Sequence, residues 1–455
     1  MSEHKTIKEY LDTVGEQIRW KRARASVILE LEQHLSDQRD AFANEGYDDA
    51  ERMAVEEMGD PVVLGTQLDG IHRPKPQKGL LAMTILFAVV CAFLRVWLTA
   101  DWDYCYLAIH PFKTVVSVCV GCMALLCGYF LDYSFLARHG KKLYWVALIF
   151  GIFVLYCSPK VNNVSYYTRY VASCFPVIYA AWFYTCRNKG WHGILSAIAG
   201  GIPLCLVCLA APSIWGALLL VIVGFVLFVM AAQKDWFSVG KGKTALVVTA
   251  GAVASLAAAC GTVLTSNHFL IRWENFLHPE RDPLGYGYTA MMAKNVLSGS
   301  QWLGEGQLSS EFGSFPYERL LPNCDTDLLL TTLIYKLGRI PFILLVTVFV
   351  VLLCWLTVRC IRQRSQFGKM VALSILIPFC LRTIAGIALS LGYIWTSVSF
   401  PFFIGNFQMI LDMGMVGLVL SVFRQDGIAQ NTEGVLRKRL HFKLVDAEGL
   451  LISYK

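Results

Sequence analysis

The sequence predicts an all-α fold: a polytopic membrane protein with about ten transmembrane helices, preceded by a small cytoplasmic helical domain. Of the 455 residues, 56% are hydrophobic, and the charges are unevenly divided. Residues 1–78 hold 27 charged side chains with a net charge of −5, whereas residues 79–455 hold 46 with a net charge of +12. A soluble globular protein carries about a quarter charged residues throughout its chain. The uneven division therefore excludes a single soluble globular fold. Because the basic excess belongs to the membrane part, it indicates membrane lipid as a partner and no nucleic acid.

Residues 1–72 are predicted to form a cytoplasmic domain of three or four helices, joined to the membrane part by a basic linker at residues 73–79. The N-terminus lacks the apolar core of a signal peptide, so we expect this domain to stay in the cytoplasm. Apolar positions of its first helix recur at spacings of three and four: Ile7, Tyr10, Leu11, Val14 and Ile18. The run Met58-Gly59-Asp60-Pro61 makes a corner. This pattern resembles the permease-prefix domains found ahead of membrane segments, which implies a regulatory or docking module.

Ten apolar segments within residues 80–423 are candidates for transmembrane helices, which need about 20 apolar residues. They are residues 80–100, 114–131, 143–158, 171–186, 192–211, 213–232, 244–265, 338–358, 370–391 and 401–423. With a cytoplasmic N-terminus, the short inside loops carry 12 Lys and Arg residues and the short outside loops carry 3. This bias follows the positive-inside rule, so both termini, including the tail 424–455, are predicted to be cytoplasmic.

The segment between the seventh and eighth spans, residues 266–337, is predicted to be a long outside loop. Ordered loops of this length usually carry function. Gly, Pro, Asp and aromatic residues concentrate in three runs of it, at residues 282–288, 298–306 and 321–330.

The order of these runs resembles the SEDS family (shape, elongation, division and sporulation), whose members are of the FtsW, RodA and SpoVE type. The positions that fit the family's loop pattern in register are Arg272, Asp282, Pro283, Gly285, Gly287, Tyr288, Ser298, Gly299, Gly304, Gly306, Leu321, Pro322, Thr326, Asp327, Leu337 and Gly338. Ten spans with both termini inside is also the topology that the resemblance implies.

The resemblance implies a protein of cell division and cell shape in the bacterial plasma membrane, acting as a glycosyltransferase that polymerises peptidoglycan from lipid II. Such a reaction needs a base that deprotonates a sugar hydroxyl while a lipid diphosphate leaves. The family's Thr-Asp pair corresponds to Thr326 and Asp327, so Asp327 is the candidate catalytic base. It stands where the polar loop meets the apolar residues 328–330, and partial desolvation there would raise its pKa. From the residues alone, Asp327 is equally well a cap of the helix that follows.

Six residues are candidates for binding the substrate: Arg272, Gly304, Gly306, Thr326, Arg382 and Asp412. Arg272 suits the diphosphate, as do Arg281 and Lys294. Arg382 and Asp412 lie on adjacent predicted spans, where a structural ion pair is the alternative to a place on the substrate path. The resemblance further implies lipid II or a related lipid-linked precursor as ligand and a transpeptidase (penicillin-binding protein) as partner. It leaves the cofactor unknown, with a divalent cation as the one to consider.

The sequence also departs from the family pattern. The family's Leu-Pro-Glu is Leu321-Pro322-Asn323, two charges that follow the position of Pro176 are lost, and residues 404–409 replace a Ser-Tyr-Gly-Gly-Ser-Ser run. These departures favour an alternative, a non-catalytic SEDS-like scaffold or precursor-binding protein. A flippase for a lipid-linked precursor is a further alternative, motivated by Arg382 and Asp412. The sequence therefore leaves open whether the chain is an enzyme.

Overall fold

The computed structural model describes residues 6–72, 76–100, 111–161, 164–265, 267–308, 317–393, 398, 400–403 and 405–425. Contacts between Cα atoms divide the chain into two compact units. The first comprises residues 1–76 with the short stretches 363–366 and 423–455, and the second comprises residues 77–362 and 367–422.

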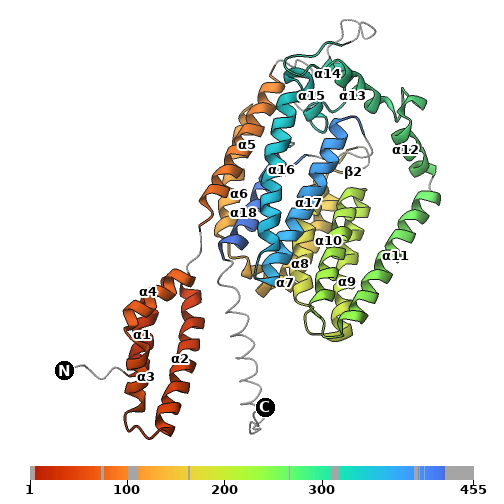
Figure 1. Cartoon of the computed structure of the whole chain (residues 1–455). Helices are drawn as coiled ribbons and strands as arrows, with labels where there is room; N and C mark the ends of the chain where they lie inside the picture. Colours follow the sequence, from red (N-terminus) through yellow and green to blue (C-terminus); the bar gives the residue numbers. More distant parts are fainter. Residues whose placement is uncertain are drawn as a thin grey trace. The chain divides into compact units, whose positions relative to one another are not determined.

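The first unit contains four helices (Figure 1): α1 (Ile7–Gln17), α2 (Lys21–Asn44), α3 (Ala50–Met58) and α4 (Pro61–His72). The predicted apolar face of α1 enters the core of this unit. Tyr10 and Val14 of this helix have no exposed surface, and neither has Ile18, the residue that caps its end. The predicted corner is also present, since Gly59 ends α3 with a φ of +80°. Asp60 then accepts a hydrogen bond from the backbone N–H of Val62 at 2.7 Å, which caps α4.

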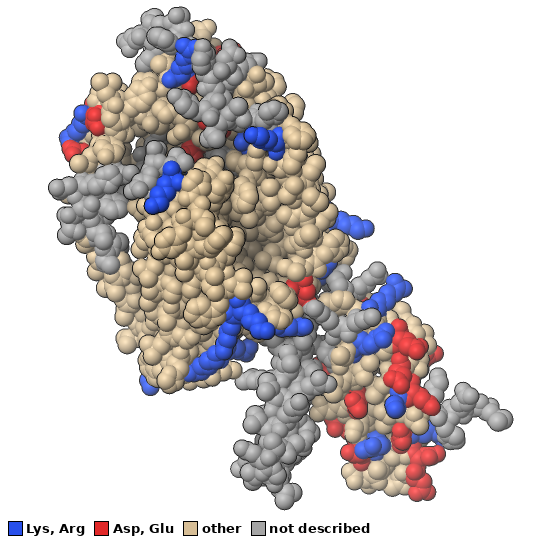
Figure 2. Space-filling view, turned by 180° about the vertical axis from the view of Figure 1, so that it is seen from behind, with Lys and Arg blue, Asp and Glu red and all other residues tan. Residues whose placement is uncertain are grey.

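Within the described residues, ten helices of the second unit stand at the ten predicted spans. They are α5 (Lys78–Leu98), α6 (Pro111–Phe130), α7 (Ser134–Cys157), α8 (Thr168–Tyr184), α9 (Gly190–Ala210), α10 (Ile214–Gln233), α11 (Lys241–Thr265), α16 (Arg339–Ile361), α17 (Gln366–Ser390) and α18 (Asn406–Arg424). Eight of them are long and apolar enough to cross a membrane, the other two being α8, with 17 residues, and α11. Figure 2 shows that the flank of this bundle carries few charges and that Lys and Arg gather toward its ends. The all-α membrane fold is confirmed.

Among the helix starts, that of α7 differs most from the predicted one. A short third span was expected at residues 143–158, but α7 begins at Ser134 and has 24 residues, with a kink at His139. Because its first turns are polar, hydropathy identifies only the later, apolar part of this helix. Likewise α5 begins at Lys78, inside the predicted linker 73–79, of which residues 73–75 lie outside the described residues.

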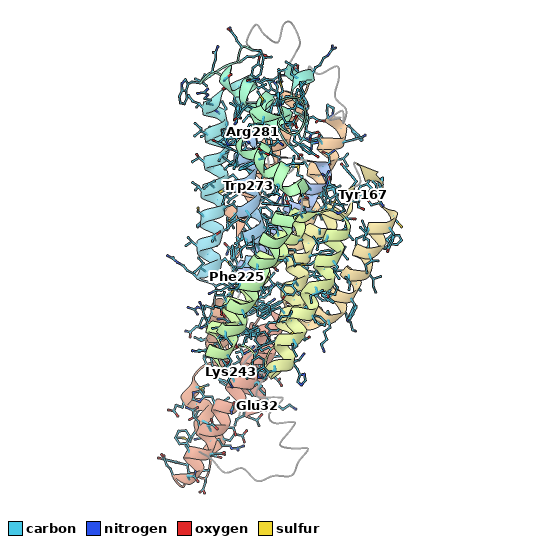
Figure 3. The ribbon with its side chains drawn as sticks, turned by 90° about the vertical axis from the view of Figure 1, so that its right-hand side faces the viewer. Glu32, Tyr167, Phe225, Lys243, Trp273 and Arg281 are labelled. Carbon is cyan, nitrogen blue, oxygen red and sulfur yellow. The ribbon has the colours of Figure 1, made fainter. Side chains whose placement is uncertain are left out.

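The segment between α11 and α16 lies at one end of the bundle, which we call the loop end (Figure 1). Its elements are α12 (Asn267–Leu277), the 3-10 helix η1 (Pro279–Arg281), α13 (Tyr288–Ser298), α14 (Tyr317–Leu320) and α15 (Leu329–Leu337). The antiparallel pair β1 (Lys160–Val161) and β2 (Val164–Ser165) lies in the connection from α7 to α8. Figure 3 shows Tyr167, Trp273 and Arg281 in the half of the bundle nearer the loop end and Lys243 at the opposite end.

Candidate functional site

Asp327 lies at the loop end, two residues before α15, and its side chain is half-buried. The N-cap of α15 is Leu328, and no side-chain hydrogen bond caps this helix. The turn before it begins at Asn323, whose φ of +54° is a left-handed conformation that Asn tolerates. The carbonyl of Asn323 accepts hydrogen bonds from the N–H groups of Thr326 at 3.1 Å and Leu328 at 3.0 Å. The turn therefore presents Asp327 ahead of the helix rather than as its N-cap.

The helix behind Asp327 is firmly held. Every residue of α15 from Leu329 to Tyr335 is buried. The Thr331 hydroxyl donates to the carbonyl of Ser390 at 2.9 Å, which joins α15 to α17. The Thr332 hydroxyl donates to the carbonyl of Cys324 at 3.1 Å, which closes the turn that carries Asp327. The backbone at Asp327 is thus fixed relative to the bundle.

Arg169, in the first turn of α8, lies close enough to Asp327 for the two charges to interact. Its guanidinium carbon lies 4.6 Å from the centroid of the Tyr166 ring and 4.9 Å from that of Tyr170. Its Nη2 donates a hydrogen bond to the Tyr170 hydroxyl at 3.0 Å. Cation–π contacts with two rings hold the guanidinium in place. Sequence reasoning did not single out Arg169, and the only signal was its rarity as one of three basic residues in the short outside loops.

An apolar cavity of about 600 Å³ lies between α7, α8 and α18, and we call it the α7–α8–α18 cavity. Its α7 wall extends from Ser158 at the loop end to Ala147, eleven residues deeper. At 1.5 Å per residue this is about 16 Å, roughly half of a 30 Å hydrocarbon core. Tyr170, which binds Arg169, also lines the cavity, and its ring centroid lies 5.4 Å from that of Phe407 on α18. The loop end of the cavity therefore adjoins the guanidinium of Arg169.

The predicted diphosphate ligands lie elsewhere on the loop segment. Arg272 belongs to α12, and its side chain lies outside what the structure describes. Arg281 forms an ion pair with Glu274. The Lys294 ammonium lies 5.8 Å from the centroid of the Tyr393 ring. A role of these residues in binding the substrate stays a prediction.

The glycines of the Gly-x-Gly run join the loop to α15. The N–H of Gly304 donates to the carbonyl of Leu337 at 3.0 Å, and that of Gly306 donates to the carbonyl of Tyr335 at 2.8 Å. A Cβ added to Gly306 would lie 2.7 Å from the carbonyl oxygen of Gly299. Close backbone packing is thus sufficient reason for glycine here. Direct contact of Gly304, Gly306 or Thr326 with substrate stays a prediction.

The turn of residues 282–288 is likewise held by its own motif residues. The Asp282 carboxylate accepts a hydrogen bond from the N–H of Tyr286 at 2.9 Å, and its carbonyl accepts one from Gly287 at 3.1 Å. A Cβ on Gly287 would lie 2.1 Å from the carbonyl oxygen of Pro279. These residues shape the loop that surrounds the site.

Arg382 of α17 and Asp412 of α18 form a buried ion pair. Nη1 of Arg382 lies 2.7 Å from Oδ1 of Asp412, and Nη2 lies 3.2 Å from Oδ2. Asp412 has no exposed side-chain surface, and it also accepts hydrogen bonds from Gln408 Nε2 at 2.8 Å and from the N–H of Phe402 at 3.2 Å. A buried carboxylate with four such bonds is typical of a structural ion pair. A place on the substrate path stays a prediction.

A metal ion does not fit the residues at this site. In the part of the chain that the structure describes, no group of three or more His, Cys, Asp or Glu side chains could hold one. Asp327 contributes one carboxylate and lies near the guanidinium of Arg169, which disfavours a second cation. We therefore assign no step of the reaction to a divalent cation.

Comparison with known proteins identifies the family of the chain. The family model of the cell cycle proteins FtsW, RodA and SpoVE matches residues 77–427. The chain belongs to this family. It is a multi-pass membrane protein, and the SEDS resemblance is confirmed.

Among its relatives is the probable peptidoglycan glycosyltransferase FtsW of Trichlorobacter lovleyi, 24% identical over 330 residues, which are 68% of this chain and 82% of that protein. Stage V sporulation protein E of Bacillus subtilis is 29% identical over 167 residues, which are 36% of this chain and 44% of that protein.

Two solved structures share the SEDS fold. One is a chain from a peptidoglycan synthase complex that coordinates polymerization and crosslinking, with a TM-score of 0.59 at 17% identity, covering 77% of this chain and 98% of that chain. The other is a mutant of the rod shape determining protein RodA of Thermus thermophilus, with a TM-score of 0.50 at 15% identity, covering 76% of this chain and 97% of that chain.

The packing role of the loop glycines predicts that Gly306→Ala destabilises the loop by about 1–3 kcal/mol, because its Cβ meets a backbone oxygen. Glu305→Ala, between the two glycines, should have little effect, because the side chain of Glu305 is exposed. Hydrogen–deuterium exchange of the detergent-solubilised protein measures this: amides of residues 299–308 should exchange faster in Gly306→Ala alone. Equal protection in both variants would contradict the packing role.

The ion pair predicts that Arg382→Met or Asp412→Leu alone lowers the free energy of unfolding by about 3–5 kcal/mol, because each leaves one buried charge unpaired. The double variant should lose less than either single variant, since it buries no charge. Unfolding of the four proteins in detergent gives the coupling free energy. Strictly additive losses would argue against a structural pair, and a stable double variant without activity would place the pair on the substrate path.

Proposed function

We propose that this SEDS protein is a lipid II-dependent peptidoglycan glycosyltransferase of cell division or cell shape. Family membership and the names of its relatives support this proposal. The observation that carries it is the place of Asp327, a half-buried carboxylate on a fixed turn at the loop end, in register with the family's Thr-Asp pair. The guanidinium of Arg169 lies within electrostatic range of this carboxylate, and Tyr170, to which Arg169 donates a hydrogen bond, lines the α7–α8–α18 cavity.

In the proposed reaction Asp327 is the general base. It accepts the proton of the acceptor sugar hydroxyl while that oxygen forms a bond to the anomeric carbon of the lipid-linked donor. The bond from this carbon to the diphosphate oxygen breaks, and the lipid diphosphate leaves with the bonding electrons. A carboxylate held by α15 meets the need for a base of fixed position, because positioning contributes strongly to such reactions.

The proposed setting is the bacterial plasma membrane, with the loop end outside and both termini in the cytoplasm. The excess of Lys and Arg in the short loops at the opposite end supports this orientation. The first unit, residues 1–72 by prediction, is then a cytoplasmic regulatory or docking module. The similar chain from a complex that coordinates polymerization and crosslinking supports a transpeptidase as partner. The relatives named as probable peptidoglycan glycosyltransferases support lipid II or a related precursor as substrate.

Polymerisation of lipid II by the purified protein, alone and with a transpeptidase partner, tests the proposal. Asp327→Ala should lower the rate by about 10²–10⁴-fold, the usual contribution of a general base. The matched control Glu305→Ala removes an exposed carboxylate from the same loop segment and should keep the parent rate. Equal polymer from Asp327→Ala and the parent would exclude this mechanism. No polymer from the parent under either condition would favour the non-catalytic alternative.

A further inference from the structure

We propose that one end of the first unit docks on the surface of an anionic lipid bilayer. This end, which we call the basic end, combines the turn between α1 and α2 with the last turn of α4. The ligand is the head-group layer of the lipid, and the residues that meet it are all outside the candidate site. Residues 1–76 precede the stretch that matches the family model, so family membership assigns them no role.

The basic end is assembled from two stretches that lie far apart in the sequence. The backbone N–H of Arg19 donates a hydrogen bond to Oδ1 of Asp69, 50 residues later, at 3.0 Å. At the other end of α1, the N–H of Ile7 donates to Oε1 of Glu51, in the first turn of α3, at 3.0 Å. The length of α1 therefore separates the basic end from the start of α3 by about 18 Å.

Charge is divided between these two ends of the unit. Residues 17–24 contain four Lys and Arg residues and no acidic residue, and three more basic residues follow α4 within residues 73–78. Residues 30–60, which include most of α2 and all of α3, contain eleven Asp and Glu residues and two Arg residues. An anionic bilayer attracts cations within about a Debye length, roughly 10 Å, and repels carboxylates. Charge therefore favours contact of lipid with the basic end and opposes contact with the acidic part.

The outer face of α4 adds apolar surface next to this charge. Val63, Gln67 and Ile71 recur at a spacing of four residues and are exposed, Val63 by 55% and Ile71 by 67%. None of the three is charged, and they lie opposite the side of α4 from which Leu64 and Leu68 pack against the core. A helix with an uncharged, partly apolar face beside basic residues is typical of binding at a membrane surface.

The covalent chain keeps the basic end near a bilayer. Five residues, 73–77, separate α4 from α5, which is long and apolar enough to cross a membrane. An extended chain of this length reaches about 20 Å. Lipid head groups are therefore present at a high effective concentration, so weak contacts are sufficient for docking. Basic charge, the uncharged stripe and this short connection favour lipid over a separate protein as the ligand.

Modification of arginine by phenylglyoxal, followed by peptide mass spectrometry, tests the charged contact in the full chain. Nanodiscs of phosphatidylcholine alone are compared with nanodiscs that also contain phosphatidylglycerol. With phosphatidylglycerol, Arg19 should react about threefold more slowly or less, because the phosphate pairs with its guanidinium. Arg39 and Arg52, in the acidic part, are internal controls and should react at the same rate in both. High salt should remove the protection of Arg19, because it screens exposed charges.

Phosphatidylglycerol with a photoreactive group tests the stripe on α4. On illumination it should label peptides of α4 and leave those of α3 unlabelled. Ile71→Gln should lower this labelling about threefold, because it removes apolar surface from the contact. The matched control Val62→Gln should not, since Val62 is 45% exposed but lies half a turn around α4 from Ile71. Arg19→Gln should also lower the labelling, whereas Arg39→Gln should leave it unchanged.

Two outcomes would overturn the proposal. An equal rate for Arg19 in both kinds of nanodisc would exclude a contact with anionic lipid, and labelling of α3 as strong as that of α4 would show that the unit meets lipid without a preferred surface. Both leaflets of a nanodisc have the same composition, so neither result depends on the orientation of the chain. Neither depends on polymerisation of lipid II, so this proposal and the proposed function fail in different measurements.

Discussion

The ion pair between Arg382 and Asp412 is the constraint on which the membrane part depends. Two charges taken out of water are tolerated only when their mutual geometry satisfies both, so the pair fixes α17 against α18. The turns of α18 that precede Asp412 bring Phe407 and Leu411 to the wall of the cavity. The same α17 accepts the hydrogen bond of Thr331, which anchors α15. One buried contact thus positions both a wall of the cavity and the support of the candidate base.

Much of this architecture was predictable because a bilayer imposes strict local rules. A span needs a certain length of apolar sequence, so hydropathy located the ten helices of the membrane part. The loop motifs were recognisable by their order. In the turn of residues 282–288, Asp282 accepts a backbone hydrogen bond, and Gly287 leaves room for a neighbouring carbonyl oxygen. The polar first turns of α7 were missed, because they extend the helix beyond its apolar stretch.

The site itself could be predicted only in part. Asp327 was identified by register, but whether it caps α15 depends on where that helix begins, which sequence locates only to within one or two residues. Arg169 gained its importance from surroundings that sequence does not reveal: contacts with two flanking tyrosine rings and the charge of a carboxylate far along the chain. The cavity depends on how α7, α8 and α18 pack, and its lining residues look like ordinary apolar positions of a span.

The length of α8 has a consequence for the lipid around it. With 17 residues it is about 26 Å long, a few Å less than a typical hydrocarbon core. A bilayer adapts to such hydrophobic mismatch by thinning locally, and basic side chains at the helix end reach toward the head groups. Arg169 stands at that end, beside the open side of the cavity. Thinning of this kind brings the lipid head groups closer to the loop end of α8, the end that carries Arg169.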